Sequence, residues 1–493
     1  MTKENAKREL YNIEKKLAAY NHALGLIYYD AVTGAPSGSS ANRAETLTVL
    51  GEEVYKLTAG EQITEILNTL DGADVDSNTK RIVEIKLKDA RETARIPMDE
   101  YLEYERLITS SSAVWHEAKL KSDYAMFKPY IKQITDTLKR FAGYVAPAVK
   151  PYDYLLDKYE PGLTSARLDD FFDLLAKGIA PLIDKAKQQK VKPLPKGVYP
   201  IDKQKELSAY LMKLIGMDER YSAIAETEHP FTTGFTKWDV RIATHYVEDD
   251  LLSNMYSVIH EGGHALYDMH TADELQYTVL GAGTSMAVHE SQSRFYENII
   301  GRSRSFITFI APTLKRLFPA LAELTDNDLY IAANAAKPSL VRTDADELTY
   351  SLHIIIRYRL EKMLFEDQID VDDLESEWNR LYGEYLGIVP ANAREGILQD
   401  CHWSDGSFGY FPSYALGSAY GAQLLKQMKK SVDVEGDVQK GEFNNINNWL
   451  NENIWRFGSL KKPNELMENA FDGLFDPNCY IKYLNDKFGE LLK

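Results

Sequence analysis

Apolar side chains recur at intervals of three and four residues along the N-terminal part of the chain. The clearest run consists of Leu10, Ile13, Leu17, Tyr20, Leu24 and Ile27. This spacing predicts a long amphipathic helix with one apolar stripe, which we expect to pack on the body of the protein rather than form a coiled coil. Similar patterns continue to about residue 190, with breaks such as 34–40 and 192–200. The chain is therefore predicted to be mostly α-helical.

One segment alternates as a β-strand does. From Trp238 to Tyr246, the even-numbered side chains point to one face and the odd-numbered side chains to the other. No repeat of fixed period, low-complexity tract or flexible Gly/Ser linker divides the 493 residues. We therefore predict a single domain, 1–493, with two helical lobes.

Charge, cysteine content and the distribution of apolar residues limit the partners and the compartment of the protein. The net charge of −17, from 57 basic and 74 acidic side chains, makes nucleic acid and anionic membranes unfavourable partners. Two cysteines cannot hold so long a chain together by disulfides, which favours a reducing compartment. The polar N-terminus, together with the lack of a run of about 18 apolar residues, argues against a signal peptide or membrane span. We expect a cytoplasmic protein.

Residues 260–264 read His-Glu-Gly-Gly-His and fall inside a helix predicted from about Leu252 to Met269. The side chains of His260 and His264 are four residues apart, so they project from one helical face and can bind one metal ion. A catalytic zinc site has three protein ligands and keeps one position for water. A third ligand must therefore come from elsewhere in the chain.

We expect Glu290 to be this third ligand. It follows His264 by 26 residues, and the intervening Gly281 and Gly283 allow a turn. Thr284 or Ser285 can then cap a second helix, 286–300, that runs back along the first and carries Glu290 towards the histidines.

Two further features of the first helix support this site. Asp268 lies four residues beyond His264 and can accept the spare ring N–H of a ligand histidine, although a plain surface carboxylate is an equal alternative. Gly262 and Gly263 cost a helix about 1 kcal/mol each, which is reasonable where another backbone or a substrate approaches closely.

These residues suit the hydrolysis of peptide bonds. Zinc polarises a carbonyl and lowers the pKa of its bound water to about 7, and Glu261 can accept the proton of that water. Cobalt is a possible substitute, since the Irving–Williams order gives such a site affinity for both ions.

Several separated motifs resemble those of the M32 metallocarboxypeptidases, the thermostable carboxypeptidase type. In chain order they are His229-Pro230-Phe231, Asp239-Val240-Arg241, 260–264, His289-Glu290-Ser291-Gln292, Val341-Arg342-Thr343-Asp344-Ala345-Asp346 and 396–403 (Gly-Ile-Leu-Gln-Asp-Cys-His-Trp). The segment from Tyr29-Asp30 to Arg43-Ala44-Glu45 is also similar. The resemblance covers nearly the whole chain.

The resemblance implies a large helical fold with a deep groove and a small β-sheet beside the helix of the metal motif. It also implies a homodimer that removes single residues from free peptide C-termini with broad specificity, and it supports His260, His264 and Glu290 as ligands and Glu261 as base. The chain departs from the family pattern at Ala243, where the family has threonine, at Tyr29 in place of tryptophan and at Val341 in place of isoleucine.

An exopeptidase must bind the free C-terminal carboxylate, and a planar guanidinium does so with two hydrogen bonds. Arg342 is the leading candidate, because Asp344 and Glu347 predict the start of a helix directly after it. A structural ion pair with Asp344 or Asp346 is the alternative. Arg241 is a weaker candidate, since it shares its strand face with Asp239.

His402 and Tyr414 are candidates to line the groove, and the resemblance implies that a tyrosine or histidine there donates to the oxyanion. Plain aromatic packing is the alternative for Tyr414. His229 is a further candidate substrate-binding residue, and more secure as a marker of the family than as a catalytic group.

Two other functions compete with a carboxypeptidase. The first is a zinc oligopeptidase that cuts internal bonds, because closely similar motifs serve such enzymes. The second is a helical binding or scaffold protein with a structural metal. The intact Glu261 argues against the second, and so does the fourth protein ligand that a closed structural site would need.

Overall fold

The structure is a computed structural model that describes residues 1–189 and 191–493. It is mostly helical with one three-stranded sheet, as the sequence predicts. The helices and strands, in chain order, are α1 (Lys3–Thr33), α2 (Ser40–Ala59), α3 (Glu61–Leu70), α4 (Ser77–Thr93), α5 (Met98–Lys121), α6 (Tyr124–Val145), α7 (Pro151–Tyr159), α8 (Ser165–Ala186), α9 (Ile201–Ile215), β1 (Ser222–Glu226), β2 (Phe231–Thr236), β3 (Asp239–Thr244), α10 (Leu251–His270), α11 (Met286–Arg294), α12 (Arg304–Leu317), α13 (Asp326–Ala333), α14 (Tyr350–Phe365), α15 (Leu374–Tyr385), α16 (Pro412–Met428), α17 (Val434–Lys440), α18 (Asn444–Asn453), α19 (Pro463–Phe471) and α20 (Asn478–Leu491).

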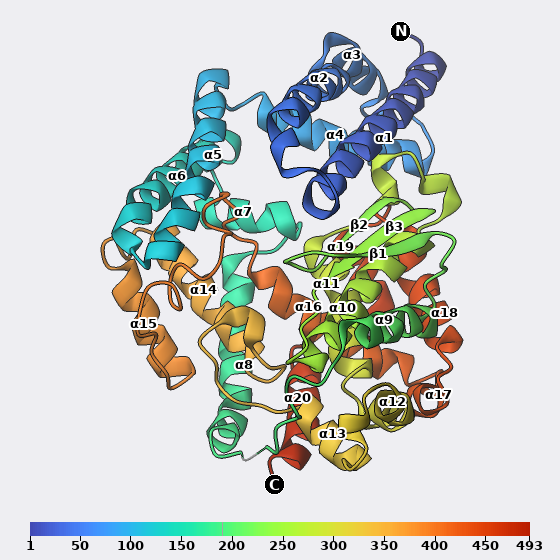
Figure 1. Ribbon diagram of the computed structural model, residues 1–493. Coiled ribbons are helices and arrows are strands. Elements are labelled where there is room, and N and C mark those ends of the chain that lie inside the picture. The colour runs from blue at the N-terminus through green and yellow to red at the C-terminus, as the bar shows by residue number, and fades with distance from the viewer. Residues whose placement is uncertain (190) are drawn as a thin grey trace.

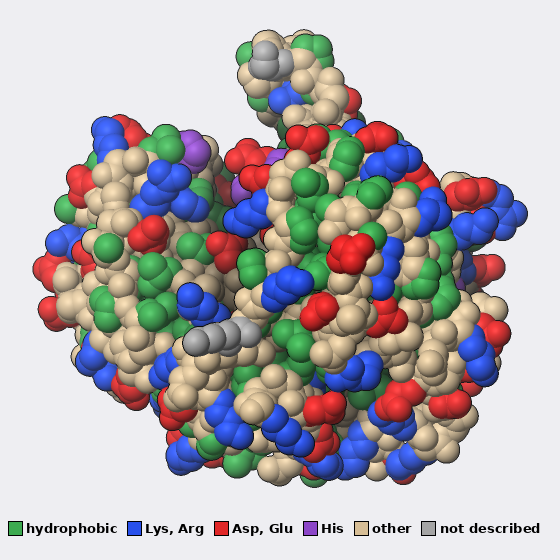
Figure 2. All heavy atoms as spheres, turned by 60° about the horizontal axis from the view of Figure 1, so that its bottom comes forward, with side chains coloured by type: hydrophobic (Ala, Val, Ile, Leu, Met, Phe, Trp, Pro, Cys, Tyr) green, Lys and Arg blue, Asp and Glu red, His purple; other side chains and the backbone are tan. Residues whose placement is uncertain are grey.

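The helices form two sides with a hollow between them. Figure 1 shows α5, α6 and α15 on one side, α9, α12 and α18 on the other, and α8 and α20 between them. In the space-filling view the surface is hollowed between the side on the left and the rest of the molecule (Figure 2). Within the described part of the chain, no helix is both long enough and apolar enough to cross a membrane.

One large hydrophobic core joins the two sides, and a smaller one holds the N-terminal helices. The large core runs from Ala118 in α5 to Phe488 in α20. The smaller core contains Leu10, Ile13 and Leu17 of α1 with apolar residues of α3 and α4. The other half of the predicted α1 stripe is only partly buried. This half extends past α3 and lies against β2, where the ring of His22 stacks on Phe235 at 5.0 Å.

The sheet has the strand order β1-β3-β2, with β1 parallel and β2 antiparallel to β3. β3 runs from Asp239 to Thr244 rather than from Trp238 to Tyr246, because Lys237 and Trp238 form the turn that joins β2 to β3. The predicted alternation holds within the strand. Val240 and Ile242 are buried, whereas Arg241 on the opposite face is only partly covered.

The departure from the family pattern at Ala243 is accommodated by packing. Ala243 is fully buried opposite Phe231 of β2. The hydroxyl of Thr244, on the other face, pairs with Ser257 at 3.1 Å and accepts from Asn254 at 3.0 Å. These bonds attach β3 to α10.

Two helices carry the predicted chemistry. α10 (Leu251–His270) matches its predicted range to within one residue at each end, and Asp250 caps its start by accepting from the backbone N–H of Ser253. Ser285 caps α11 as predicted, but α11 ends at Arg294 and the chain continues as a π-helix, Phe295–Ile300. The expected single helix 286–300 is therefore two segments with different hydrogen-bonding patterns.

α10 and α11 approach each other closely at Gly263. A Cβ at this position would lie 2.6 Å from the carbonyl oxygen of Gln292 and 2.7 Å from the Cα of Ser293. The glycine of the metal motif thus admits a neighbouring backbone, which is one of the two reasons that the sequence suggests for it.

Candidate metal centre

Three side chains converge between α10 and α11. The Glu290 Oε2 atom lies 3.5 Å from His264 Nε2 and 3.9 Å from His260 Nε2. One ligand atom from each residue lies within 4.8 Å of the others, and among the described residues this group of His260, His264 and Glu290 is the one able to hold a metal ion. The structure thus brings together the three residues that the sequence singles out.

The donor set fits zinc. Donors at about 2.0–2.1 Å from a tetrahedral zinc lie about 3.4 Å from one another, close to the separations seen here. Two imidazole nitrogens and one carboxylate oxygen leave a coordination position for water, as in catalytic rather than structural zinc sites. The Oε1 atom of Glu290 accepts from Arg294 Nε at 2.6 Å, so Oε2 is the oxygen turned towards the histidines.

The charge states of the group suit metal binding. Burial raises the pKa of Glu290, but Arg294 and the two histidines outweigh it and hold that pKa well below its usual range. Burial lowers the pKa of His264. At neutral pH Glu290 therefore offers an ionised carboxylate and His264 an unprotonated ring nitrogen, the forms that ligate metals. Burial lowers the pKa of His260, but Glu290 and Glu297 outweigh it and raise that pKa, so the His260 ring must release a proton when it binds a metal.

His260 is oriented by a carboxylate from the π-helix. Its Nδ1 atom lies 2.9 Å from Glu297 Oε2. Glu297 in turn accepts from Arg294 Nη1 and Arg302 Nη2, each at 3.2 Å. Glu297 was not predicted from the sequence, because its position depends on a π-helix that side-chain periodicity does not reveal.

On its Nδ1 side, His264 contacts a second histidine rather than a carboxylate. Its Nδ1 atom lies 2.7 Å from His289 Nδ1, and His289 Nε2 lies 3.2 Å from Asp268 Oδ1. From the sequence, direct acceptance from a ligand histidine and a plain surface position were equal alternatives for Asp268. The structure instead places His289 between Asp268 and His264.

Glu261 lies beside the three converging residues and is held from the sheet. It is buried, and its Oε2 atom accepts from the hydroxyl of Thr232 at 2.6 Å. The same hydroxyl lies 3.0 Å from the carbonyl oxygen of Glu261. Thr232 belongs to β2 and was not identified from the sequence, because this contact crosses between two elements.

Arg342 is paired, but not with the partners considered from the sequence. It is only 8% exposed, and its Nε and Nη2 atoms lie 2.9 and 2.8 Å from Asp400 Oδ1. Its Nη1 atom donates to the Tyr350 hydroxyl at 3.0 Å. The helix expected directly after it begins only at Tyr350, since Asp346 accepts backbone N–H groups in the preceding turn.

His402 and Tyr414 lie in the same cluster as Arg342. His402 Nε2 is 3.2 Å from the Tyr414 hydroxyl, and the Arg342 guanidinium is 5.0 Å from the Tyr414 ring. Burial lowers the pKa of His402 to about 4, so its ring is neutral at pH 7. The Tyr350 ring, 4.2 Å from the Arg294 guanidinium, joins this cluster to Glu290.

Comparison with known proteins agrees with the geometry of the candidate metal centre. A family model described as Carboxypeptidase Taq (M32) metallopeptidase matches residues 9–488. The chain belongs to the M32 metallopeptidase family. Carboxypeptidase 1 of Bacillus subtilis is 39% identical over 491 residues, with 98% of each chain covered. Thermostable carboxypeptidase 1 of Pyrococcus furiosus is 34% identical, with 96% of each chain covered.

Solved M32 structures share the fold throughout. The M32 carboxypeptidase of Deinococcus radiodurans superposes with a TM-score of 0.95 at 31% identity, covering 99% of both chains. A Pyrococcus furiosus carboxypeptidase gives 0.95 at 33% identity, covering 98% of this chain and 99% of that one. The resemblance found in the sequence is confirmed, and this M32 protein is a metallocarboxypeptidase, a hydrolase of peptide bonds.

Two predicted substrate-binding residues of the M32 chain lie apart from the Arg342 cluster. Arg241 forms a two-point ion pair with Asp239, at 2.8 Å for each contact, and its guanidinium lies 5.1 Å from the rings of both Tyr29 and Phe235. It therefore lies on the sheet face that meets α1, opposite the face that packs on α10. His229 is exposed in the connection between β1 and β2.

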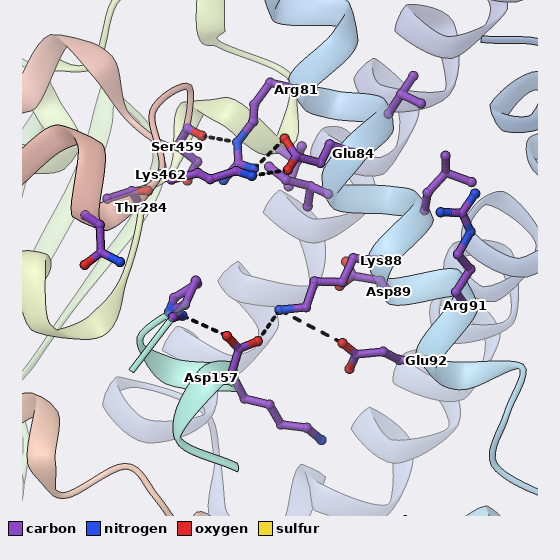
Figure 3. A pocket seen from close by; sticks show the side chains of 18 of the residues that line it. Arg81, Glu84, Lys88, Asp89, Arg91, Glu92, Asp157, Thr284, Ser459 and Lys462 are labelled. Carbon is purple, nitrogen blue, oxygen red and sulfur yellow. Dashed lines mark hydrogen bonds and ion pairs between the residues drawn. The ribbon is translucent and has the colours of Figure 1, made fainter. Parts of the chain in front are cut away.

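A cavity of about 1710 Å³ lies between α4, α7 and the start of α19, and none of the predicted site residues lines it. Figure 3 shows several of its charged side chains directed at one another, among them Lys88 with Asp157 and Arg81 with Glu84. Lys88 pairs with Asp157 at 2.7 Å, and Arg81 pairs with Glu84 at 3.0 Å. These charges are satisfied within the cavity wall, so the cavity is distinct in both place and chemistry from the metal centre.

Proposed function

We propose that this M32 enzyme is a zinc-dependent carboxypeptidase that releases single amino acids from peptide C-termini with broad specificity. The observation that carries the proposal is the convergence of His260, His264 and Glu290 with Glu261 beside them. The two Nε2 atoms and Glu290 Oε2 would hold the ion. Cobalt is an expected substitute, because availability rather than affinity selects between the two metals at such a site.

Glu261 is proposed as the general base. Zinc held by His260, His264 and Glu290 would supply Lewis-acid chemistry, polarising the scissile carbonyl and bringing the pKa of a water molecule to about 7. Glu261 would accept the proton of the attacking water and pass it to the leaving amine. The hydroxyl of Thr232 donates to one carboxylate oxygen of Glu261, which restricts the orientation of the carboxylate.

Arg342 is proposed to bind the C-terminal carboxylate of the peptide. A guanidinium has five N–H donors, and three of its nitrogens already contact Asp400 or Tyr350 here. Nη1 and Nη2 each keep a second N–H, so a carboxylate can still be bound by two hydrogen bonds. His402 and Tyr414, next to Arg342, are proposed to donate to the oxyanion, with Arg241 and His229 as more distant substrate contacts.

We also propose an oligomeric state and a cellular compartment. The family resemblance leads us to propose a homodimer, which sedimentation equilibrium would test. Cys401 and Cys479 are both free thiols, which supports the proposal of a reducing, cytoplasmic location.

Peptides that differ by one residue at the C-terminus test whether the enzyme acts as a carboxypeptidase. With zinc-loaded enzyme we expect stepwise loss of single residues from the C-terminus, and little cleavage when the C-terminus is amidated, because the carboxylate that binds Arg342 is then lost. Internal cleavage that ignores amidation would instead indicate a zinc oligopeptidase.

The variant Glu261→Gln tests the base. We expect it to keep zinc while kcat falls about 10²- to 10⁴-fold, the usual contribution of a general base. Glu274→Gln is a matched control, since Glu274 is an exposed carboxylate just beyond α10, and it should leave kcat unchanged. Full activity in zinc-loaded Glu261→Gln would refute the assignment.

A further inference from the structure

Two imidazole rings stand in series between the metal centre and a carboxylate. The first is His264, whose Nε2 atom faces Glu290, and the second is His289, which bridges His264 Nδ1 and Asp268 Oδ1. The other ligand histidine has no such intermediate, because His260 Nδ1 reaches Glu297 directly at 2.9 Å. The two histidines of the metal motif are therefore supported by chemically different groups.

With a metal ion on His264 Nε2 and both rings uncharged, the hydrogen bonds in this series have one direction that satisfies every atom. If Nε2 of His264 offers its lone pair to a metal, the ring proton must be on Nδ1. His264 Nδ1–H then donates to the bare Nδ1 of His289, which leaves the His289 proton on Nε2. That N–H donates to Asp268, and an ionised carboxylate accepts it. The reverse direction would put a proton on Asp268 and another on the nitrogen that is to bind the metal.

We propose that His289 is a positioning residue, which fixes the ring orientation and the Nδ1–H tautomer of His264, and that Asp268 acts on the metal centre only through His289. The inference rests on the proposed role of His264 as a metal ligand.

Packing holds His289 in this place. Its ring lies 5.0 Å from that of Tyr267 and 4.8 Å from that of His264. A Cβ at Gly283 would lie 2.7 Å from His289 Cδ2, so the turn before α11 comes close to the ring as well. Any planar ring of this size would fill the space between these neighbours equally well. Packing does not account for a nitrogen at 2.7 Å from His264 together with a carboxylate at 3.2 Å on the opposite side.

His289→Ala should remove the acceptor for His264. Loss of such a hydrogen bond to a metal-binding histidine costs 10- to 100-fold in metal affinity, and we expect a loss of this size. His289→Asn places its Oδ1 atom near the position of Nδ1, so it can still accept from His264 but is too short to reach Asp268. We expect this variant to recover part of the affinity.

The dissociation constant of zinc, measured by competition with a chromophoric chelator, tests the proposal in the full-length protein. Asp268→Ala should weaken zinc binding in the wild type but should have no further effect in His289→Ala, because its path to the metal is then already broken. The visible absorption spectrum of the cobalt-loaded protein should shift in His289→Ala and lie nearer to that of the wild type in His289→Asn. His270→Ala is the matched control, since His270 is on the same helix but its ring meets the Leu266 carbonyl and the Trp455 ring rather than a proposed metal ligand.

Wild-type zinc affinity and an unchanged cobalt spectrum in His289→Ala would overturn the proposal. A double variant, Asp268→Ala with His289→Ala, whose loss of zinc affinity equals the sum of the two single losses would overturn it as well. His264→Ala separates this failure from a failure of the proposed function. If His264→Ala loses zinc while His289→Ala does not, only the positioning role of His289 is refuted. If His264→Ala also keeps zinc, the metal site itself is wrong. Circular dichroism and the thermal midpoint of the metal-free variants show that each has folded.

Discussion

The carboxylate of Glu261 is oriented from a strand and not from its own helix. Thr232 of β2 donates to Glu261 Oε2 at 2.6 Å, while the register of the sheet places Thr232 opposite the buried Ile242 of β3. The side chains of such a pair share one face of the sheet, so the hydroxyl points at α10 because the strand packs there. The edge strand thereby fixes the group proposed as the base.

Thr232→Val keeps the β-branched shape and removes this hydrogen bond. A hydrogen bond to a charged group contributes about 1.5–3 kcal/mol, so we expect kcat to fall about tenfold or somewhat more. KM and zinc affinity should not change, because Thr232 contacts no proposed metal ligand or carboxylate-binding group. Steady-state kinetics on a tripeptide would measure the effect, and Thr232→Ser should restore most of kcat. An equal loss in the serine variant would mean that shape, and not the hydroxyl, is required.

The sequence predicts those residues whose relation is local. His260, His264 and Glu261 follow from helical spacing, and Glu290 follows from a turn and a cap that are both visible in the sequence. Thr232 and Asp400 are reached only through tertiary contacts. His289 stands next to Glu290, but its role depends on the direction of the ring, which no spacing rule gives.

At the scale of elements, the metal centre depends on how closely α10 and α11 approach. Gly263 lies against the backbone of Gln292 and Ser293, and Gly417 of α16 lies against Glu290 from the other side. The segment that carries Glu290 is therefore held between two helices at glycine contacts. Its position is set by backbone contact and not by flexible side chains.

Gly263→Ala should separate α10 from α11. Overpacking of this kind costs about 1–3 kcal/mol of the free energy of unfolding, and the displacement of Glu290 should weaken zinc binding as well. Gly143→Ala is the control, because Gly143 is also inside a helix, in α6, but has open space where its Cβ would be. This second change should stabilise the protein by about 0.5–1 kcal/mol. Urea unfolding and chelator competition measure both effects, and a Gly263→Ala protein with unchanged zinc affinity would contradict the prediction.

The elements were predictable to different degrees. The range of α10 and the cap of α11 follow from capping residues and a strong apolar periodicity. The π-helix does not, because its extra residue per turn leaves the local composition unchanged. β1 was not predicted because it is short, and β2 was not predicted because it contains Gly234, a residue that weakens the strand pattern.

At the scale of the whole molecule, the N-terminal helices are attached rather than independent. Their core contains apolar residues of α1, α3 and α4, but α2 contributes no buried residue. Leu275 and Leu280, from the segment after α10, complete this core. A unit of this size with so small a core is marginal by itself, which is why we propose that 1–493 is a single domain in which α1–α4 depend on the rest.

Leu275→Ala tests this dependence. Leu275 is 1% exposed, and its truncation removes about 2–5 kcal/mol of packing between α1–α4 and the segment that leads to α11. Because parts of a protein open with different free energies, amide hydrogen exchange in α1, α3 and α4 should become faster while α10, α11 and α16 keep their protection. Leu474→Ala, at a leucine that is 74% exposed, should leave amide exchange unchanged in both groups of helices. Uniform protection across α1–α4 and the body in the wild type, insensitive to Leu275→Ala, would show that the small core supports itself.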